Sequence, residues 1–257
     1  MGFKNCFKAV LLLLFFSFAY SEVSAQGLKG RARFTAKKRY WSYGGTLTST
    51  NYMGDLAPVN SKGSIDWGST RAQWGGFIQK RYAPRISARL SLSNMFFAGS
   101  DKDAGLNPDR GLSFNTWGFN LNLQGVIDLF PNAGVYYRRP KVPIPYVALG
   151  LGAIYSNYTV SQDASADYVG VKITDEMKQG DVFTYNVPLS LGVRYKLSTH
   201  LDIGLEGTLN FTGSDKIDGI DNSINGSTFK EFNDVYMTIG FNLAYIMGGT
   251  IKMPKFR

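Results

Sequence analysis

Residues 235–245 have the sequence VYMTIGFNLAY, in which an apolar side chain stands at every second position. The odd positions from Val235 to Tyr245 are all apolar, whereas Thr238 and Asn242 lie among the even positions. A repeat of two residues places the odd positions on one face of a β-strand, because a helix would need a repeat of about 3.6 residues. The segment is therefore predicted to be a strand with one apolar face.

The same alternation recurs along the chain, in segments 86–93, 119–128, 183–195 and 201–212. Three less regular segments, 40–52, 71–82 and 143–157, bring the number of expected strands to eight. Most of them have about ten residues or more, close to the ~9–11 residues with which a tilted strand crosses a bilayer. Strands of soluble sheets are shorter, with about 5–6 residues. The lengths favour a membrane barrel, and a soluble ligand-binding barrel of eight strands is the structural alternative.

The connections between these strands alternate in length. Segments 83–85 and 196–200 are short and 130–142 is of medium length, whereas long polar loops are expected at 54–70, 99–111, 158–181 and 214–234. Short turns at one end and long loops at the other are typical of outer-membrane barrels, whose turns lie in the periplasm. The chain is therefore predicted to be all-β, with residues 40–247 forming an eight-stranded antiparallel transmembrane outer-membrane β-barrel. Eight strands leave room only for side chains inside, which disfavours an open channel.

Residues 1–25 have the organisation of a secretory signal peptide. Lys4 and Lys8 precede an apolar segment, and Val23-Ser24-Ala25 provides the small residues of a cleavage site. The apolar segment is too short for a stable membrane span, which disfavours the alternative of an uncleaved anchor helix. Export followed by cleavage near Ala25 predicts a mature protein in the cell outer membrane.

The remaining segments are assigned by their position relative to the barrel. Residues 26–39 form a basic N-terminal segment and residues 248–257 a short tail, both expected in the periplasm. Residues 238–245 fit the loose pattern by which the barrel-assembly machinery recognises a last strand, although an ordinary amphipathic strand fits it too. The tail leaves no residues for a peptidoglycan-binding domain after the barrel.

The formal net charge is +9, from 28 Lys and Arg against 19 Asp and Glu. Most acidic residues fall in the four long loops, whereas basic residues gather before the first strand and at the short turns. The topology therefore places acidic loops outside the cell and basic turns in the periplasm. Positive charge in the periplasm disfavours nucleic acid as a partner. Outer-membrane lipid with anionic headgroups, or an acidic periplasmic protein, is the expected partner.

A few charged residues fall on the polar faces of the expected strands. They are Arg89, Asp128, Arg194, Asp202 and Glu206. Polar faces point into the lumen of an outer-membrane barrel, where isolated charges would be costly. These side chains are predicted to pair with one another inside a filled lumen, and a path for protons or ions is the alternative.

Catalysis and metal binding find little support in the sequence. Acyl transfer usually needs a nucleophile beside a His base, and His200, the only histidine, is expected in an exposed short turn. The only cysteine, Cys6, would leave with the signal peptide. Two clusters of aspartates could bind a divalent cation, but they lack the other ligands of a calcium loop. The first is Asp101 with Asp103, and the second is Asp215, Asp218 and Asp221. A non-enzymatic protein without a cofactor or metal is expected.

A series of short motifs runs through the first half of the chain. They are Asn51-Tyr52-Met53-Gly54-Asp55-Leu56, Arg81-Tyr82, Pro84-Arg85, Asp109-Arg110 before Leu112-Ser113-Phe114, and Pro145-Tyr146-Val147. In this order they resemble the PorG-like outer-membrane β-barrels of Bacteroidota, over roughly residues 40–155. The resemblance marks Tyr52, Gly54, Asp55, Leu56, Arg85 and Arg110 as the motif positions of that family. The alternative role is structural, since Gly54 permits a tight turn and Asp55 can cap it.

The resemblance also implies a function, that of an accessory barrel of a type IX secretion (gliding) apparatus. In that system the PorG protein contacts a periplasmic ring of proteins, and Arg138, Arg139 and Lys141 would face such a ring. The alternative is an OmpA/OmpX-like surface barrel. Its acidic extracellular loops would bind a ligand, a host surface or lipopolysaccharide.

Overall fold

The computed structural model describes residues 38–53, 70–100, 112–131, 135–162, 179–214, 217 and 235–247. All of them lie in one compact unit, Ala36–Arg257. The expected signal peptide, most of segment 26–39 and the tail 248–257 lie outside the described residues. Among these residues, no helix combines the length and the hydropathy that crossing a membrane would require.

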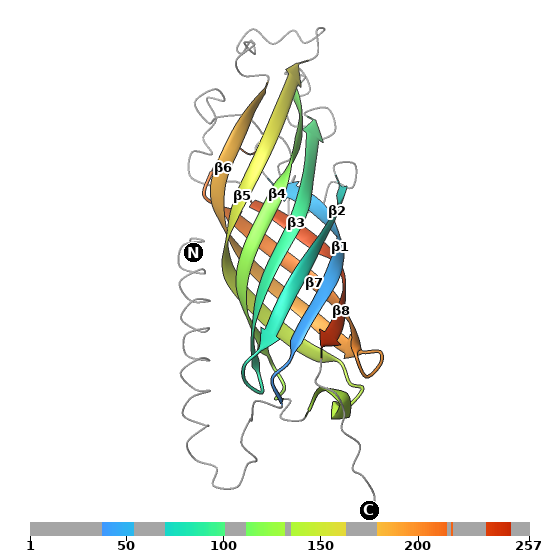
Figure 1. Cartoon of the computed structure of the whole chain (residues 1–257). Coiled ribbons are helices and arrows are strands. Elements are labelled where there is room, and N and C mark those ends of the chain that lie inside the picture. The colour runs from blue at the N-terminus through green and yellow to red at the C-terminus, as the bar shows by residue number, and fades with distance from the viewer. Residues whose placement is uncertain are drawn as a thin grey trace, which may run out of the picture. The chain divides into compact units, whose positions relative to one another are not determined.

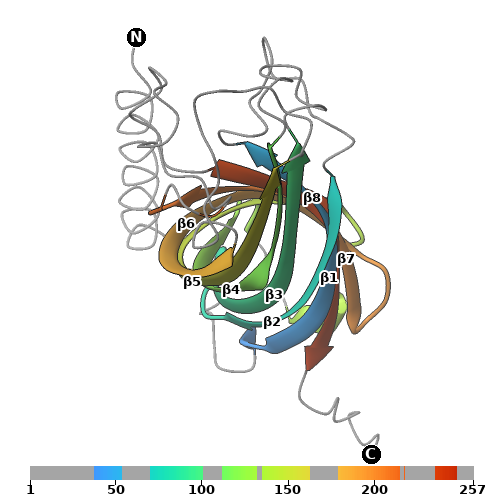
Figure 2. The same cartoon turned by 90° about the horizontal axis from the view of Figure 1, so that it is seen from above.

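Eight antiparallel strands form a closed barrel, as predicted (Figures 1 and 2). They are β1 (Trp41–Met53), β2 (Arg71–Arg81), β3 (Ile86–Ser100), β4 (Leu112–Asp128), β5 (Ile144–Gln162), β6 (Gln179–Lys196), β7 (Leu201–Thr212) and β8 (Val235–Met247). Each strand pairs with the next one along the chain, and β1 pairs with β8 from Trp41 opposite Met247 to Met53 opposite Val235. This last pairing closes the barrel, so no sheet edge remains along that seam.

The alternation of side chains separates an apolar outside from a polar inside. In β4, Asn120 and Asn122 are buried, whereas Phe119 and Leu121 on the opposite face are each 47% exposed. The same holds around the barrel, where the most exposed apolar side chains include Leu47, Trp74, Leu123, Leu151, Leu191 and Phe241. An apolar band of this extent fits lipid rather than water as its surroundings.

The strands β3 to β6 are longer than expected, with 15, 17, 19 and 18 residues. Residues 99–100, 158–162 and 179–181, which the sequence suggested as loop, lie in these strands. Figure 1 shows them extending beyond the other four at the long-loop end. In β3 the prediction failed because the neighbouring apolar residues Phe96 and Phe97 interrupt the alternation. In β5, Tyr158 and Val160 turn toward the interior while Thr159 is exposed, so the apolar face is the inner one there.

An apolar cluster fills the interior at the long-loop end. Its buried members are Met95, Phe97, Phe114, Ile154, Val160, Ile217 and Tyr236. Phe97 and Tyr236 pack edge to face, with ring centroids 4.9 Å apart. Ile217 comes from the β7–β8 connection, and its carbonyl oxygen accepts a hydrogen bond from Thr116 at 2.8 Å. The cluster explains why the long strands continue, since their inward side chains pack together here.

The medium connection between β4 and β5 covers the short-turn end of the barrel. It contains a single turn of 3-10 helix, Tyr136–Arg138. Tyr136 is buried and forms a small cluster with Tyr40 and Ile246. The connection is therefore an inward-packed segment and not a simple exposed turn.

Candidate functional site in the barrel interior

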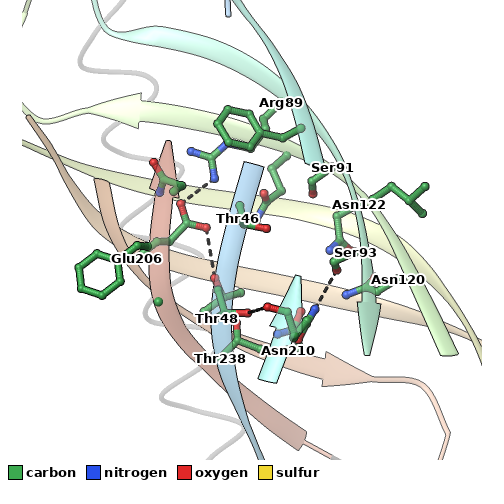
Figure 3. Close-up of a pocket in the computed structure, with 18 residues that line it drawn as sticks. Thr46, Thr48, Arg89, Ser91, Ser93, Asn120, Asn122, Glu206, Asn210 and Thr238 are labelled. Atoms are coloured by element: carbon green, nitrogen blue, oxygen red, sulfur yellow. Dashed lines mark hydrogen bonds and ion pairs between the residues drawn. The ribbon is translucent and has the colours of Figure 1, made fainter. Parts of the chain in front are cut away.

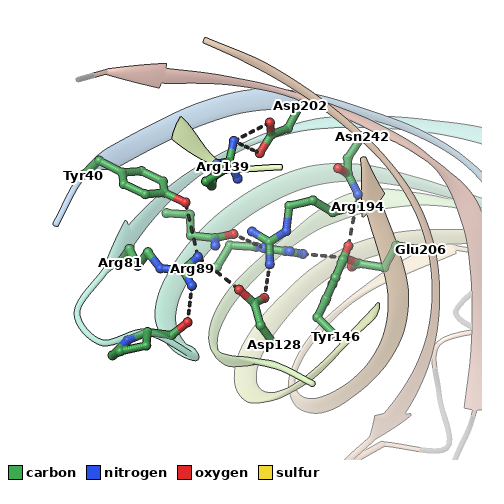
Figure 4. A network of polar contacts seen from close by, with 12 residues as sticks. Tyr40, Arg81, Arg89, Asp128, Arg139, Tyr146, Arg194, Asp202, Glu206 and Asn242 are labelled. Carbon is green, nitrogen blue, oxygen red and sulfur yellow. Dashed lines mark hydrogen bonds and ion pairs between the residues drawn. The ribbon is translucent and has the colours of Figure 1, made fainter. Parts of the chain in front are cut away.

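The interior near the short-turn end contains a network of ion pairs (Figure 4). Its centre is Asp128 at the end of β4, whose side chain is fully buried. Arg81 Nη1 donates to Asp128 Oδ2 at 3.0 Å, and Arg194 Nη2 donates to Asp128 Oδ1. One carboxylate therefore binds two guanidinium groups, one from β2 and one from β6.

A second pair lies further along the lumen. Arg89 Nη1 donates to Glu206 Oε2 at 2.6 Å, and Tyr146 Oη donates to the same oxygen at 2.5 Å. The Arg89 guanidinium also lies over the rings of Phe77 and Tyr146, at 5.3 and 5.5 Å from their centroids. Hydrogen bonds and ring faces thus surround the buried charge, which a desolvated ion pair needs in order to be tolerated.

A third pair joins the β4–β5 connection to β7. Arg139 Nη2 donates to both oxygens of Asp202, at 2.6 and 2.9 Å. Lys196 Nζ donates to the carbonyl oxygens of Tyr137 and Arg139, at 3.0 and 2.8 Å. These bonds fasten the connection across the barrel end, and they bury Arg139.

The structure places the five expected lumen residues in the interior, each in an ion pair. Three further participants lie where the sequence suggested an exposed basic end; they are Arg81, Arg139 and Lys196. Arg139 in particular is 5% exposed and differs from the expectation that it faces a periplasmic partner. The physical reason is Asp202, which would otherwise be a buried carboxylate without a counter-charge.

The alternation indicates the direction of two of these residues. Arg81 continues the inward positions Phe77 and Gln79 of β2, so its face was readable from the alternation. Arg139 lies in an irregular connection, where no repeat indicates the direction of a side chain. Lys196 follows Arg194 by two residues and lies on the same inward face, but it is also the last residue of β6, at the boundary with the expected turn 196–200.

A polar cavity of about 70 Å³ lies in the barrel interior (Figure 3). Most of its lining residues carry hydroxyl or amide groups, and the Arg89–Glu206 pair and Phe77 also border it. The hydroxyl and amide residues include Thr46, Thr48, Ser91, Ser93, Asn120, Asn122, Asn210 and Thr238. The Oδ1 atoms of Asn120 and Asn122 accept no hydrogen bond from the residues that the structure describes. A cavity of this size and polarity can hold a few ordered waters.

The exposed surface at the short-turn end is basic. Arg39, Arg85 and Lys141 are exposed, and Arg138 is the last residue of the 3-10 helix in the β4–β5 connection. The described connections at this end, 82–85, 129–131, 135–143 and 197–200, contain no acidic residue. The exposed residues of these three connections, together with Arg39, are called the short-turn face below.

The remaining sequence-based candidates are placed as follows. Tyr52 pairs through its backbone with Tyr236 at the end of β1, whereas Gly54, Asp55, Leu56 and Arg110 lie outside the described residues. The loop aspartates suggested as weak metal ligands, Asp101, Asp103, Asp215, Asp218 and Asp221, lie outside them too. Within the described ranges, no group of three or more His, Cys, Asp or Glu residues could hold a metal ion.

His200 is half-buried, in contrast to the expected exposed position. Its ring stacks on Tyr245 with centroids 5.8 Å apart, and its Nε2 lies 3.3 Å from Tyr136 Oη. These contacts hold the β6–β7 turn against β8 and the β4–β5 connection. The described neighbours of His200 include no serine–carboxylate pair with which it could act as a base.

A scan of protein families matches residues 34–254 to the family described as Domain of unknown function (DUF6089). The chain belongs to this DUF6089 family. The match covers the whole barrel. No curated protein matches the chain.

Solved structures similar to this DUF6089 protein are outer-membrane barrels. Ail of Yersinia pestis, in complex with the heparin analogue sucrose octasulfate, is 8% identical with a TM-score of 0.44, over 82% of this chain and 99% of that chain. The N-terminal barrel of Pseudomonas aeruginosa OprF is 12% identical with a TM-score of 0.41, over 82% and 98%. A major outer membrane protein from Thermus thermophilus is 11% identical with a TM-score of 0.43, over 81% and 99%. Identities this low concern the fold alone.

The filled lumen leads to a prediction about conductance. In the described part of the interior, the apolar cluster occupies one end and the ion pairs with the β4–β5 connection occupy the other. The purified protein is therefore expected to leave a planar lipid bilayer silent under an applied voltage. Arg139→Gln, which releases the connection from Asp202, is the variant in which brief openings should first appear. Stable current steps from the unaltered protein would contradict a closed lumen.

Proposed function

We propose that this protein is a non-enzymatic outer-membrane barrel that serves as an accessory component of a type IX secretion assembly. The single observation that carries the proposal is the short-turn face, which is exposed, basic and free of acidic residues in its described connections. Such a face has the charge to bind an acidic surface in the periplasm. The type of assembly, a type IX secretion system, is inferred from the motif resemblance in the first half of the chain.

The interior network supports this role by making the face rigid. Arg139 and Lys196 fasten the β4–β5 connection to the barrel wall, and this leaves Lys141 on the outside of a fixed segment. A fixed segment loses less conformational entropy on binding than a free loop does. The buried Arg139 thus affects the face only by fixing the backbone of this connection, and the exposed Arg39, Arg85 and Lys141 are available to a partner.

The test is recovery of periplasmic ring proteins after crosslinking in cells. The double variant Arg85→Gln/Lys141→Gln is expected to reduce recovery roughly fivefold, as for two exposed ion pairs worth about 0.5 kcal/mol each. The matched control is Arg71→Gln, which removes an exposed positive charge at the opposite end of the barrel. Unchanged recovery in the double variant would exclude the short-turn face as the contact. Normal secretion of cargo in a deletion strain would refute the role in secretion.

A second candidate function rests on the extension of β3 to β6 beyond the rest of the barrel (Figure 1). Its outward face is polar, with Asn115, Thr159 and Asp181 exposed. A polar sheet beyond the apolar band favours an OmpA/OmpX-like surface protein that binds a ligand outside the cell. The deletion strain discriminates between the two functions, because a surface binder would be lost without any effect on secretion.

A further inference from the structure

We infer that the barrel interior binds a single small anion, chloride in the cell envelope, beside Arg194. The first observation is a charge imbalance in the described interior. Five basic side chains, Arg81, Arg89, Arg139, Arg194 and Lys196, face three carboxylates, Asp128, Asp202 and Glu206. Buried charge of one sign is costly unless an opposite charge compensates it.

The contacts show where the uncompensated charge lies. Arg89 is paired with Glu206, and Arg139 binds both oxygens of Asp202. The ammonium group of Lys196 lies against two carbonyl oxygens at the barrel end. Of the three carboxylates in the described interior, Asp128 alone is shared, between Arg81 and Arg194, so this group of three side chains has one positive charge in excess.

Within this group, Arg194 is the residue with an unsatisfied donor. Its Nη2 binds Asp128, but its Nε is buried and makes no hydrogen bond with the described residues. Arg81, by comparison, also donates to the Tyr40 hydroxyl and to the Pro84 carbonyl. A buried guanidinium N–H without an acceptor is rare in proteins, because its desolvation is not offset. The missing acceptor is what an anion would supply.

A cavity is present at this place. A space of about 10 Å³ is lined by Arg194, Arg89, Ser42 and Asn242, among others. That volume holds about one water-sized particle. Asp202 also borders the space, but both of its oxygens are engaged by Arg139. The size excludes sulfate and phosphate and leaves room for a monatomic anion. The Arg194 and Arg89 guanidinium groups and the Asn242 amide supply the N–H donors, whereas the Ser42 hydroxyl already donates to the Gln79 carbonyl oxygen.

A water molecule is the competing occupant, and it differs in charge. Water would accept a hydrogen bond from Arg194 Nε, but it would leave the excess charge in place. Chloride satisfies the same N–H group and also neutralises the group around Asp128. The two occupants are therefore distinguished by an anomalous scatterer of the same charge.

The direct experiment uses the unaltered protein crystallised in sodium bromide in place of sodium chloride. The expected result is an anomalous bromide peak at hydrogen-bond distance from Arg194 Nε, in the space beside Arg89. Density without anomalous signal at that position, as from water, would overturn the inference. So would bromide peaks confined to the outer surface.

The second experiment measures thermal unfolding in detergent, in chloride and in gluconate at equal ionic strength. Because gluconate is too large for the cavity, only chloride can stabilise the folded protein by binding there. At a chloride concentration of about ten times its dissociation constant, the midpoint of unfolding is therefore expected to be about 3–6 °C higher than in gluconate. Arg194→Gln should abolish the difference, since it removes the excess charge and the free N–H. Arg71→Gln, which removes a surface charge far from the cavity, should keep it. Equal midpoints in the unaltered protein, or a difference that survives in Arg194→Gln, would refute the site.

Discussion

Replacing Asp128 with Asn is expected to lower the free energy of unfolding by about 3–5 kcal/mol. Within the described part of the chain, Asp128 is the one carboxylate bound to Arg81 and Arg194, and its side chain is fully buried. The amide has nearly the same shape but carries no charge, so two guanidinium groups would face each other without a counter-charge. Urea titration of the refolded barrel, followed by tryptophan fluorescence, measures the change.

Two comparisons separate the loss of the ion pairs from a general effect of the substitution. Asp181→Asn changes an exposed carboxylate that accepts a hydrogen bond from Asn157, and it should cost less than about 0.5 kcal/mol. Arg194→Gln in the Asp128→Asn background should recover part of the loss, because it removes one of the two unpaired cations. An additive effect of the two substitutions would contradict the shared-carboxylate arrangement.

Replacing Gly44 with Val is expected to prevent the barrel from closing. Gly44 lies in β1 opposite Ala244 of β8, on the face that points into the lumen. A Cβ atom there would collide with the Leu243 carbonyl oxygen and would lie 2.8 Å from the Phe77 ring. The backbone oxygen cannot move aside, since it belongs to the neighbouring strand of the seam. The folded form, which migrates faster than the heated form on electrophoresis, should be absent or greatly reduced.

The adjacent glycine provides the control for this prediction. Gly45 is on the outward face, and a Cβ atom there would come no closer than 3.7 Å to another atom, the Gly75 carbonyl oxygen. Gly45→Val should therefore fold as the unaltered chain does. If both variants fold equally well, the close approach of β1 and β8 at Gly44 does not limit assembly.

The sequence predicted the strands well where one face is uniformly apolar. In β7 the predicted segment 201–212 and the observed strand have the same bounds, because Leu201, Ile203 and Leu205 alternate with polar residues without interruption. In β3 the prediction ended at residue 93, but the strand continues to Ser100. Beyond residue 93 both faces carry large apolar side chains, one toward the outside and one toward the interior cluster, so the repeat of two disappears.

The candidate site was predicted only in part. The polar faces assigned Arg89, Asp128, Arg194, Asp202 and Glu206 to the interior, and they lie there. The pairing was not predictable, because the partners are far apart in the chain: Arg89 and Glu206 are separated by 117 residues, and Asp128 and Arg194 by 66. Which side chains meet across a lumen depends on the stagger of the strands around the closed barrel.

By itself the sequence therefore determined the class of fold, the face on which each strand residue lies and the end at which the short turns gather. Alternation and loop length are local properties, and they need no knowledge of distant neighbours. Tertiary structure alone decided that Arg139 turns inward to Asp202, that Asp128 binds two arginines and that Arg194 Nε has no acceptor among the described residues. Each of these depends on which groups closure brings within hydrogen-bond distance, and on the cost of leaving a buried charge without a partner.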